Sequence, residues 1–379
     1  MRHKIQINKY IAGLVISVFM FNSTHLYVEA ATPVPFVHAA SACLLDVSSG
    51  RILYEKNGHQ PRRIASLTKV VTGWIAIKSN KLDQIVTVSA NAARQEGSSV
   101  YLRAGEKIKM RDLLYAMMMR SGNDAAMAIA ESVAGSSQQF AQLMNTEVKH
   151  LHLKNTHFVN PHGLDHKDHY ASADDFARLT AQALKNPLFH QIVSTKYYRI
   201  SRSTELQGMK LKNKNKFLWM AENADGVKTG YTRAAGRCLA ASSSIEGRQV
   251  VLIVLDDPSD WSDAKQLLNY GLRVYHRVNV ATITQKEFLL PVHDGIIQKV
   301  KTVPKFSIYY PLRTDEDAKI TYRISQQKSI APIHLGQSLG NLYVFLNHQL
   351  IGTTPLLAKE EIPAKSWWGK LKGLFSSSR

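Results

Sequence analysis

Three short motifs follow one another along the chain and together carry the groups that an acyl-transfer reaction needs. They are Ser66-Leu67-Thr68-Lys69, Ser121-Gly122-Asn123 and Lys228-Thr229-Gly230. A serine hydroxyl becomes a nucleophile when a nearby base takes its proton, and a neutral lysine amine can be that base. A second hydroxyl can relay a proton, and a second lysine can hold a carboxylate. The three motifs therefore indicate chemistry that uses serine without histidine.

None of these motifs is specific by itself. The S-x-x-K pattern also occurs from Ser262 to Lys265 and from Ser325 to Lys328, and S-x-N recurs from Ser89 to Asn91, whereas K-T-G occurs once. Only the set that begins at Ser66 has all three motifs in order, with separations of 55 and 107 residues (66 to 121 and 121 to 228). The ordered set is what indicates a site.

The sequence around Ser66 predicts the helix that positions it. Apolar residues recur at helical spacing after the serine: Leu67, Val70, Val71, Trp74 and Ile75. Ser66 then lies at the helix start, where unpaired N–H groups favour negative charge. Lys69 lies three residues further on and shares its face. A helix-capping role is the alternative for Ser66.

The other two motifs are predicted on a loop and on a strand. Ser121-Gly122-Asn123 separates two apolar helical runs and predicts a tight loop between buried helices, although the same residues also suit an ordinary helix stop and start. Lys228-Thr229-Gly230 precedes strand-like segments and predicts an edge strand whose backbone approaches a ligand closely. A surface lysine is the alternative for Lys228.

The ordered triple resembles that of penicillin-binding proteins and class A β-lactamases. Further segments extend the likeness over about residues 36–275, namely 46–57, 65–69, 160–165 (Asn160-Pro161-His162-Gly163-Leu164-Asp165) and 170–175. They are similar to the low-molecular-mass penicillin-binding proteins, the D-alanyl-D-alanine carboxypeptidases of serine peptidase family S11.

This resemblance implies a serine D-Ala-D-Ala carboxypeptidase that acts on peptidoglycan pentapeptides and is acylated by β-lactams. Ser66 is the implied nucleophile, Lys69 its base and Ser121 the proton relay. The implied substrate-binding residues are Asn123, Lys228, Thr229 and Gly230. The backbone N–H groups of Ser66 and Tyr231 are the implied oxyanion hole. An arginine that helps to bind the carboxylate in some relatives is not placed by the sequence.

Two other functions are weighed against this one. A β-lactamase shares the triple, but the class A type needs a glutamate that activates water, and no E-x-x-L-N segment lies between Asn123 and Lys228. A wall-binding protein with an inactive peptidase domain would lack a motif residue, and here all are present. Whether the acyl group also passes to an amine is left open.

The N-terminus predicts export. Arg2, Lys4 and Lys9 precede an apolar run over residues 11–21 that is too short to span a bilayer, so residues 1–30 are predicted to be a signal peptide. An uncleaved anchor is the alternative. Cleavage lowers the formal charge from +19 to about +17, because three basic residues and Glu29 are lost. Such a protein suits anionic wall polymers or lipid headgroups, and nucleic acid is not an expected partner.

No cofactor or metal is predicted. Cys43 and Cys238 lie in apolar strand-like surroundings, and because the family fold separates their strands we expect free thiols in preference to a disulfide. Four histidines lie within residues 157–169, but they form no H-E-x-x-H pattern. A metal site there remains the minor alternative.

The predicted fold class is α+β, in several parts. Residues 36–275 alternate strands and helices, and the resemblance makes them a β-lactamase/transpeptidase-like domain, a five-stranded antiparallel sheet with an inserted helical subdomain closed by a helix over 261–275. Short alternating segments over 278–362 predict a small all-β domain without chemistry of its own, a spacer or an oligomer contact.

Residues 364–376 predict a basic amphipathic helix. Trp367, Trp368, Leu371, Leu374 and Phe375 share one stripe, with lysines mostly off it. We expect this helix to lie on the outer face of the cytoplasmic membrane without spanning it. A tail helix packed on the β domain is the alternative.

Overall fold

The computed structural model describes residues 33–283, 285–326 and 328–366. The predicted signal peptide and the tryptophans and leucines of the predicted C-terminal helix lie outside these residues. No helix in the described part of the chain is long and apolar enough to cross a bilayer.

A five-stranded antiparallel sheet forms the first layer, as predicted. Its spatial order is β2-β1-β11-β10-β9. The strands are β1 (Ser41–Asp46), β2 (Ile52–Lys56), β9 (Ala224–Thr232), β10 (Gly236–Ile245) and β11 (Arg248–Leu255). The K-T-G motif therefore lies on β9, which is the edge strand that the sequence predicted.

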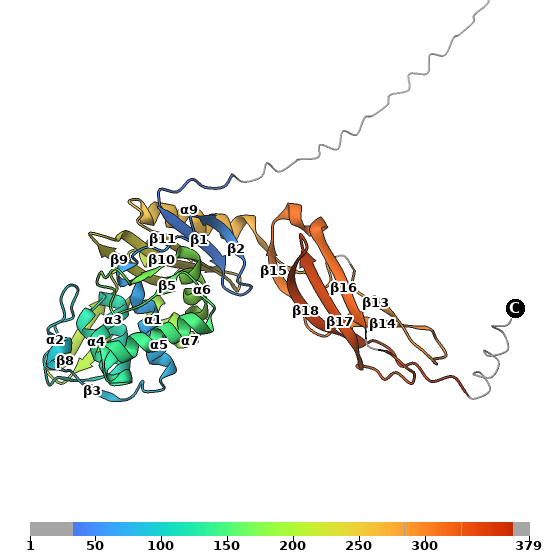
Figure 1. Cartoon of the computed structure of the whole chain (residues 1–379), viewed down its shortest axis with the longest axis horizontal. Coiled ribbons are helices and arrows are strands. Elements are labelled where there is room, and N and C mark those ends of the chain that lie inside the picture. Colours follow the sequence, from blue (N-terminus) through green and yellow to red (C-terminus); the bar gives the residue numbers. More distant parts are fainter. Residues whose placement is uncertain (1–32, 284, 327, 367–379) are drawn as a thin grey trace, which may run out of the picture. The chain divides into compact units, whose positions relative to one another are not determined.

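Residue alternation along these strands builds two separate cores. On β1, Leu44 packs with the last helix, α9 (Asp260–Val274), while its neighbours Cys43 and Leu45 pack with the other helices. Successive strand residues point to opposite faces, so each strand serves both cores. Helix α9 thus covers one face of the sheet and α6 (Ala173–Leu184) lies against the other (Figure 1).

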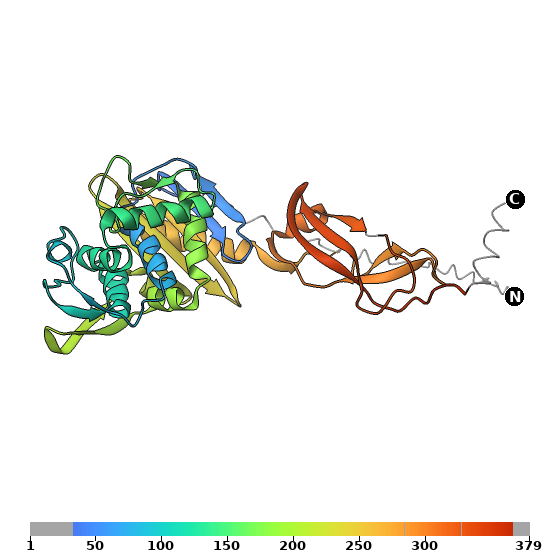
Figure 2. The same cartoon turned by 60° about the horizontal axis from the view of Figure 1, so that its bottom comes forward.

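The helical subdomain is inserted between β2 and β9. After a short 3-10 turn its helices follow as α1 (Lys69–Lys78), α2 (Ala90–Ala93), α3 (Met110–Arg120), α4 (Asn123–Ala134), α5 (Ser137–His150), α6, α7 (Pro187–Ser194) and α8 (Phe217–Met220). Figure 2 shows α1 running through the middle of this group. It is buried along nearly its whole length, which fixes the residues at its N-terminus.

Two small sheets complete this domain. One has the order β3-β4-β7-β8 and comprises β3 (Ile85–Thr87), β4 (Lys107–Lys109), β7 (Tyr197–Arg202) and β8 (Glu205–Lys212). The other pairs β5 (Thr156–His157) with β6 (Tyr170–Ala171). The loop between β5 and β6 carries residues 160–165.

The described residues that follow α9 are all β apart from one 3-10 turn, η2 (Thr314–Lys319), which confirms the small all-β domain predicted over 278–362. A five-stranded sheet has the order β13-β14-β18-β17-β16, and β12 pairs with β15. These strands are β12 (His276–Asn279), β13 (Phe288–Pro291), β14 (Lys299–Pro304), β15 (Tyr309–Leu312), β16 (Ile320–Gln326), β17 (Ser338–Leu346) and β18 (Gln349–Ala358).

Both cysteines are free and buried, as expected. Strand β11 separates their strands, because Ile253 pairs with Cys43 on one side and with Ala240 on the other. Burial raises the pKa of both thiols, that of Cys238 to about 12, so neither is a ready nucleophile.

Candidate active site

Ser66 lies in a tight turn immediately before a buried helix. The structure places it in the 3-10 turn η1 (Ala65–Thr68), and α1 begins at Lys69, so the regular helix starts three residues later than the serine. Ala65 adopts a left-handed backbone with φ of 47°, uncommon for a residue with a side chain. The Nζ of Lys69 lies 3.0 Å from the Ser66 hydroxyl oxygen, which confirms that the two residues face each other.

The surroundings of Lys69 favour an amine that can accept a proton. Its Nζ also bonds Asn123 Oδ1 at 2.7 Å and the carbonyl oxygen of His162 at 2.7 Å. Both are acceptors only, so they take the two N–H groups of a neutral amine and leave its lone pair for the Ser66 hydroxyl. Burial, and then the positive charge of Lys228, hold the pKa of Lys69 well below its usual value.

The second motif is a tight loop between two buried helices, as predicted. Helix α3 ends at Arg120 and α4 begins at Asn123. Ser121 is buried in the left-handed conformation at φ 63°, a strained geometry for a non-glycine residue. The amide of Asn123 is fixed at both ends, because its Nδ2 donates to the carbonyl of Glu96 at 2.5 Å. Its acceptor end must therefore face Lys69.

Lys228 is a buried cation at the edge of the sheet. Its Nζ donates to the carbonyl of its neighbour Thr229 at 2.7 Å, and burial followed by the charge of Lys214 lowers its pKa to about 7. Its charge is therefore held less firmly than that of an exposed lysine. A bound carboxylate would favour the charged form.

Gly230 allows β9 to lie directly against the nucleophile turn. A Cβ added there would be 3.0 Å from the carbonyl oxygen of Ile64 and 3.1 Å from the backbone nitrogen of Ser66. The next residue, Tyr231, is 68% exposed. Because Tyr231 directly follows Gly230, this close approach brings its part of β9 next to the backbone of Ser66, the other residue of the implied oxyanion hole. Only glycine fits at position 230 without displacing the turn.

Two supporting contacts were missed at the level of sequence. The backbone N–H of Val159 donates to His169 Nδ1 at 3.1 Å, so the ring carries its proton on Nε2, which lies 2.8 Å from the Thr68 hydroxyl. Thr68 in turn donates to the carbonyl of Ala65 at 2.8 Å. The chain of bonds holds the nucleophile turn from behind. No pattern in the sequence connects these residues.

Asp124 organises the loop in front of Asn123. Its fully buried carboxylate accepts from the Ser99 hydroxyl at 2.6 Å and from the N–H groups of Val100 and Leu102 at 3.0 and 3.1 Å. The same loop accepts the Asn123 N–H at the carbonyl of Ser98, at 2.6 Å. A carboxylate in the first turn of α4 also interacts favourably with the helix dipole.

The two buried histidines among the four in residues 157–169 are held by bonds to the backbone of this segment. His162 and His169 are buried, and burial lowers the pKa of each to about 3. No group of histidine, cysteine and acidic residues suited to a metal occurs among the residues that the structure describes. The rival motifs are also scattered: Ser89 caps α2, Ser262 lies within α9 and Ser325 within β16.

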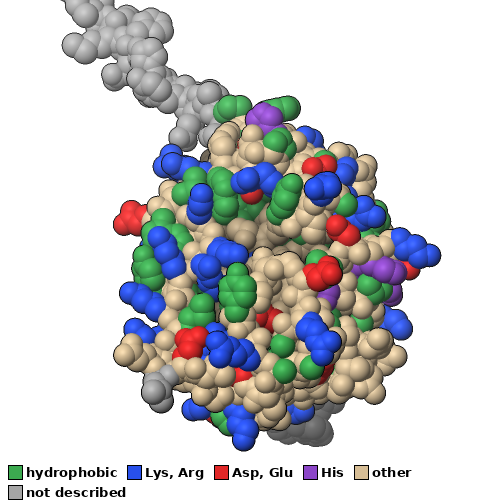
Figure 3. Space-filling model, turned by 90° about the vertical axis from the view of Figure 1, so that its left-hand side faces the viewer, with side chains coloured by type: hydrophobic (Ala, Val, Ile, Leu, Met, Phe, Trp, Pro, Cys, Tyr) green, Lys and Arg blue, Asp and Glu red, His purple; other side chains and the backbone are tan. Residues whose placement is uncertain are grey.

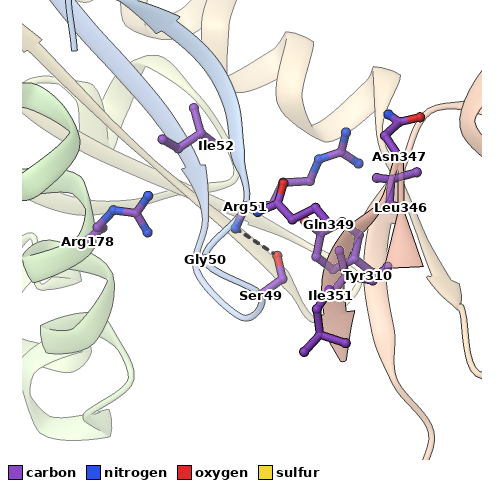
Figure 4. Close-up of a pocket in the computed structure, with 11 residues that line it drawn as sticks. Ser49, Gly50, Arg51, Ile52, Arg178, Tyr310, Leu346, Asn347, Gln349 and Ile351 are labelled. Carbon is purple, nitrogen blue, oxygen red and sulfur yellow. Dashed lines mark hydrogen bonds between the residues drawn. The ribbon is translucent and has the colours of Figure 1, made fainter. Parts of the chain in front are cut away.

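A pocket elsewhere on the surface contains none of the motif residues. It is lined by Ser49, Gly50, Arg51, Ile52, Arg178, Tyr310, Leu346, Asn347, Gln349, Leu350 and Ile351 (Figure 4). The turn after β1 is held there by the Arg51 N–H, which donates to the Ser49 hydroxyl at 3.2 Å. The Ser49 hydroxyl donates to Asp46 Oδ1 at 2.8 Å, so it too is used to hold this turn.

The comparisons with known proteins agree with this arrangement. The family model of D-alanyl-D-alanine carboxypeptidase, peptidase S11, matches residues 28–259, and that of the penicillin-binding protein 5 C-terminal domain matches residues 282–364. The chain is 31% identical to the D-alanyl-D-alanine carboxypeptidase DacD of Escherichia coli over 96% of this chain and 97% of that one. It is 30% identical to the carboxypeptidase DacF of Bacillus subtilis over 86% of each. Penicillin-binding protein 5 of Haemophilus influenzae superposes with a TM-score of 0.71 at 27% identity, over 88% of this chain and 99% of that structure.

Proposed function

The chain belongs to the D-alanyl-D-alanine carboxypeptidase family of serine peptidases, S11, and from that premise we propose how its residues perform the reaction and where it acts. The activity of the family is removal of the terminal D-alanine from peptides that end in D-Ala-D-Ala. The observation that carries the mechanism is the buried Lys69 amine, 3.0 Å from the Ser66 hydroxyl.

In acylation, Lys69 takes the proton of the Ser66 hydroxyl as the oxygen attacks the carbonyl of the D-Ala-D-Ala bond. The negative charge on the carbonyl oxygen is stabilised by the N–H groups of Ser66 and Tyr231, an interaction worth about 3–4 kcal/mol per donor. Ser121 relays this proton from Lys69 to the nitrogen of the leaving D-alanine, which restores the neutral Lys69 amine. Water then attacks the acyl-enzyme and releases the shortened peptide, with Ser66 regaining its proton.

Binding places the scissile bond. The Asn123 amide contacts the peptide, and Lys228 with Thr229 holds the terminal carboxylate. Gly230 lets β9 lie close to the Ser66 turn, so that the carboxylate-binding residues stand next to the nucleophile.

β-Lactams are expected to acylate Ser66, since their strained amide and carboxylate resemble the D-Ala-D-Ala end. A β-lactamase would in addition need rapid hydrolysis of that ester. The three contacts of Lys69 Nζ in this structure are Ser66, Asn123 and the His162 carbonyl, and no glutamate is among them. This supports slow release and a carboxypeptidase.

We propose that the protein is exported and lies on the outer face of the cytoplasmic membrane. The N-terminal signal pattern, the net charge of +19 and the tryptophan-rich basic tail support this location. The C-terminal β domain then serves as a spacer between the tail and the peptidase domain. Binding to vesicles of zwitterionic and anionic lipid, with and without residues 364–379, tests the tail.

The test of the nucleophile is covalent labelling. The mature protein is incubated with penicillin and its mass measured, beside Ser66→Ala and the control Ser89→Ala, which alters the rival S-x-N match. We expect one adduct in the wild type and in the control, on a peptide that contains Ser66, and none in Ser66→Ala. An adduct that persists in folded Ser66→Ala would assign the nucleophile elsewhere.

A further inference from the structure

One face of the β7–β8 hairpin carries a row of cations. Arg199 lies directly opposite Lys210, and Tyr197 lies opposite Lys212, in the antiparallel register. Opposed residues project from the same face, and so do residues two apart on one strand. Lys214 continues the alternation just beyond the end of β8. We call Arg199, Lys210, Lys212 and Lys214 the lysine ladder; all four are exposed.

The part of the chain that the structure describes supplies no acidic partner for these cations. Among the described residues, no ion pair involves a member of the lysine ladder, and the Arg199 guanidinium donates to the backbone carbonyl of Gln207. Like charges directly across a strand pair are destabilising. The ladder therefore lowers the stability of the free protein, and an anionic partner would remove that penalty.

Exposed aromatic rings lie between the cations. The Lys210 amine lies 5.4 Å from the ring centre of Tyr197, and the Lys212 amine 5.5 Å from that of Trp219. Tyr197 is 52% exposed and Trp219 is 41% exposed. Cations held against ring faces are partly ordered before any ligand arrives, which lowers the entropic cost of binding.

The ladder leads into the active site. The Lys214 N–H donates to the carbonyl of Met119 at 2.9 Å, and the Arg120 guanidinium bonds the Lys212 carbonyl at 3.3 Å. Both acceptor and donor belong to the last turn of α3, next to Ser121. The charge of Lys214 also reaches Lys228 and Lys69, whose pKa values it lowers. A long ligand bound along the ladder could therefore reach the active site with one of its ends.

We propose that the lysine ladder binds the free carboxylates of the peptidoglycan strand whose D-Ala-D-Ala end occupies the site. This inference rests on the proposed function. The cations of the lysine ladder recur every two residues, about 7 Å apart along an extended strand, a spacing that suits a linear polyanion. Figure 3, which views the side on which β8 lies in Figure 1, shows Lys and Arg side chains over much of this face, with acidic side chains between them. A lipid surface would cover the ladder but does not explain its continuity with Ser121.

The test compares two substrates and two variants of the full chain. The substrates are uncross-linked peptidoglycan strands with pentapeptide stems and the same strands with their side-chain carboxylates amidated. The variants are Lys210→Gln/Lys212→Gln and the control Lys299→Gln/Lys301→Gln, a pair of exposed lysines with the same spacing on β14. D-alanine release and co-sedimentation with the strands are both measured, at about 50 and 300 mM salt, because screening weakens exposed charge pairs.

For each protein we compare kcat/KM and binding on the free-carboxylate strands with the same quantities on the amidated strands. We expect this ratio to be about five-fold lower in the ladder variant than in the wild type, and the salt dependence of both quantities to be mostly lost. The control variant should keep the wild-type ratio. Equal losses on both substrates would overturn the proposal, as would an unchanged ratio. Absence of D-alanine release by the wild type, with charge-dependent binding retained, would count against the proposed function and leave the ladder standing.

Discussion

Gly230→Ala tests whether β9 must touch the nucleophile turn. The glycine has no left-handed φ, so alanine can adopt its backbone, and only space is at issue. The new Cβ would lie 3.0 Å from the Ile64 carbonyl oxygen, 3.1 Å from Ser66 N and 3.2 Å from Leu67 N. These are backbone atoms, so β9 and the turn must separate by a few tenths of an ångström. The separation displaces the N–H groups of Ser66 and Tyr231 from the oxyanion.

Loss of one oxyanion donor costs about a hundred- to a thousand-fold in rate, so partial displacement should cost about ten- to a hundred-fold. Overpacking should also lower the free energy of unfolding by about 1–3 kcal/mol. The assays are the second-order rate of acylation by penicillin and D-alanine release, with denaturant unfolding alongside. Gly73→Ala in α1 is the matched control, because its Cβ meets nothing closer than 3.4 Å. Wild-type acylation by Gly230→Ala would refute the close-approach geometry.

Three further predictions concern titratable side chains in and around the site. The pKa values of His162 and His169 are about 3 in the folded protein, so below pH 6.5 the unfolded state binds more protons than the folded one. Lowering the pH from about 7 to 5 should therefore reduce the free energy of unfolding by about 2 kcal/mol per histidine. Denaturant titration measures this change, and a stability that does not depend on pH would contradict it. Lys214→Gln removes a positive charge that lowers the pKa values of Lys228 and Lys69. Both limbs of the pH profile of kcat/KM should therefore move to higher pH. A shift to lower pH would contradict the effect of Lys214 on these two amines. Asp124→Asn removes acceptors for the N–H groups of Val100 and Leu102, so it should lower the free energy of unfolding by about 1–3 kcal/mol and slow acylation by penicillin. Wild-type stability in denaturant and a wild-type acylation rate would show that this loop does not support the site.

The sequence predicted the elements that hold the motifs because their signals are local. The apolar spacing after Ser66 gave the buried helix, and the three-residue step to Lys69 gave the facing hydroxyl and amine. The strand character after Lys228 gave the edge position of β9. Ser66 proved to lie in a 3-10 turn rather than in the first α-helical turn, a difference of backbone geometry that periodicity does not encode.

The groups that support the motifs could not be predicted, because tertiary packing brings them there. His169 reaches Thr68 only after the β5–β6 loop folds over the turn, 101 residues away in sequence. The lysine ladder depends on strand register, which alternation of lysines alone does not fix. The lowered pKa of Lys69 depends on burial and on Lys228, and both follow from the assembled fold.

D-alanine release from an acyl-Lys-D-Ala-D-Ala peptide tests the central claim most directly. The mature protein is compared with Ser66→Ala and with Lys69→Met, which keeps the length of the side chain but removes the amine. The account predicts release by the wild type, none by Ser66→Ala and a loss of at least about a hundred-fold by Lys69→Met. Release that survives in folded Ser66→Ala, or that is unchanged in Lys69→Met, would contradict a serine carboxypeptidase whose base is Lys69.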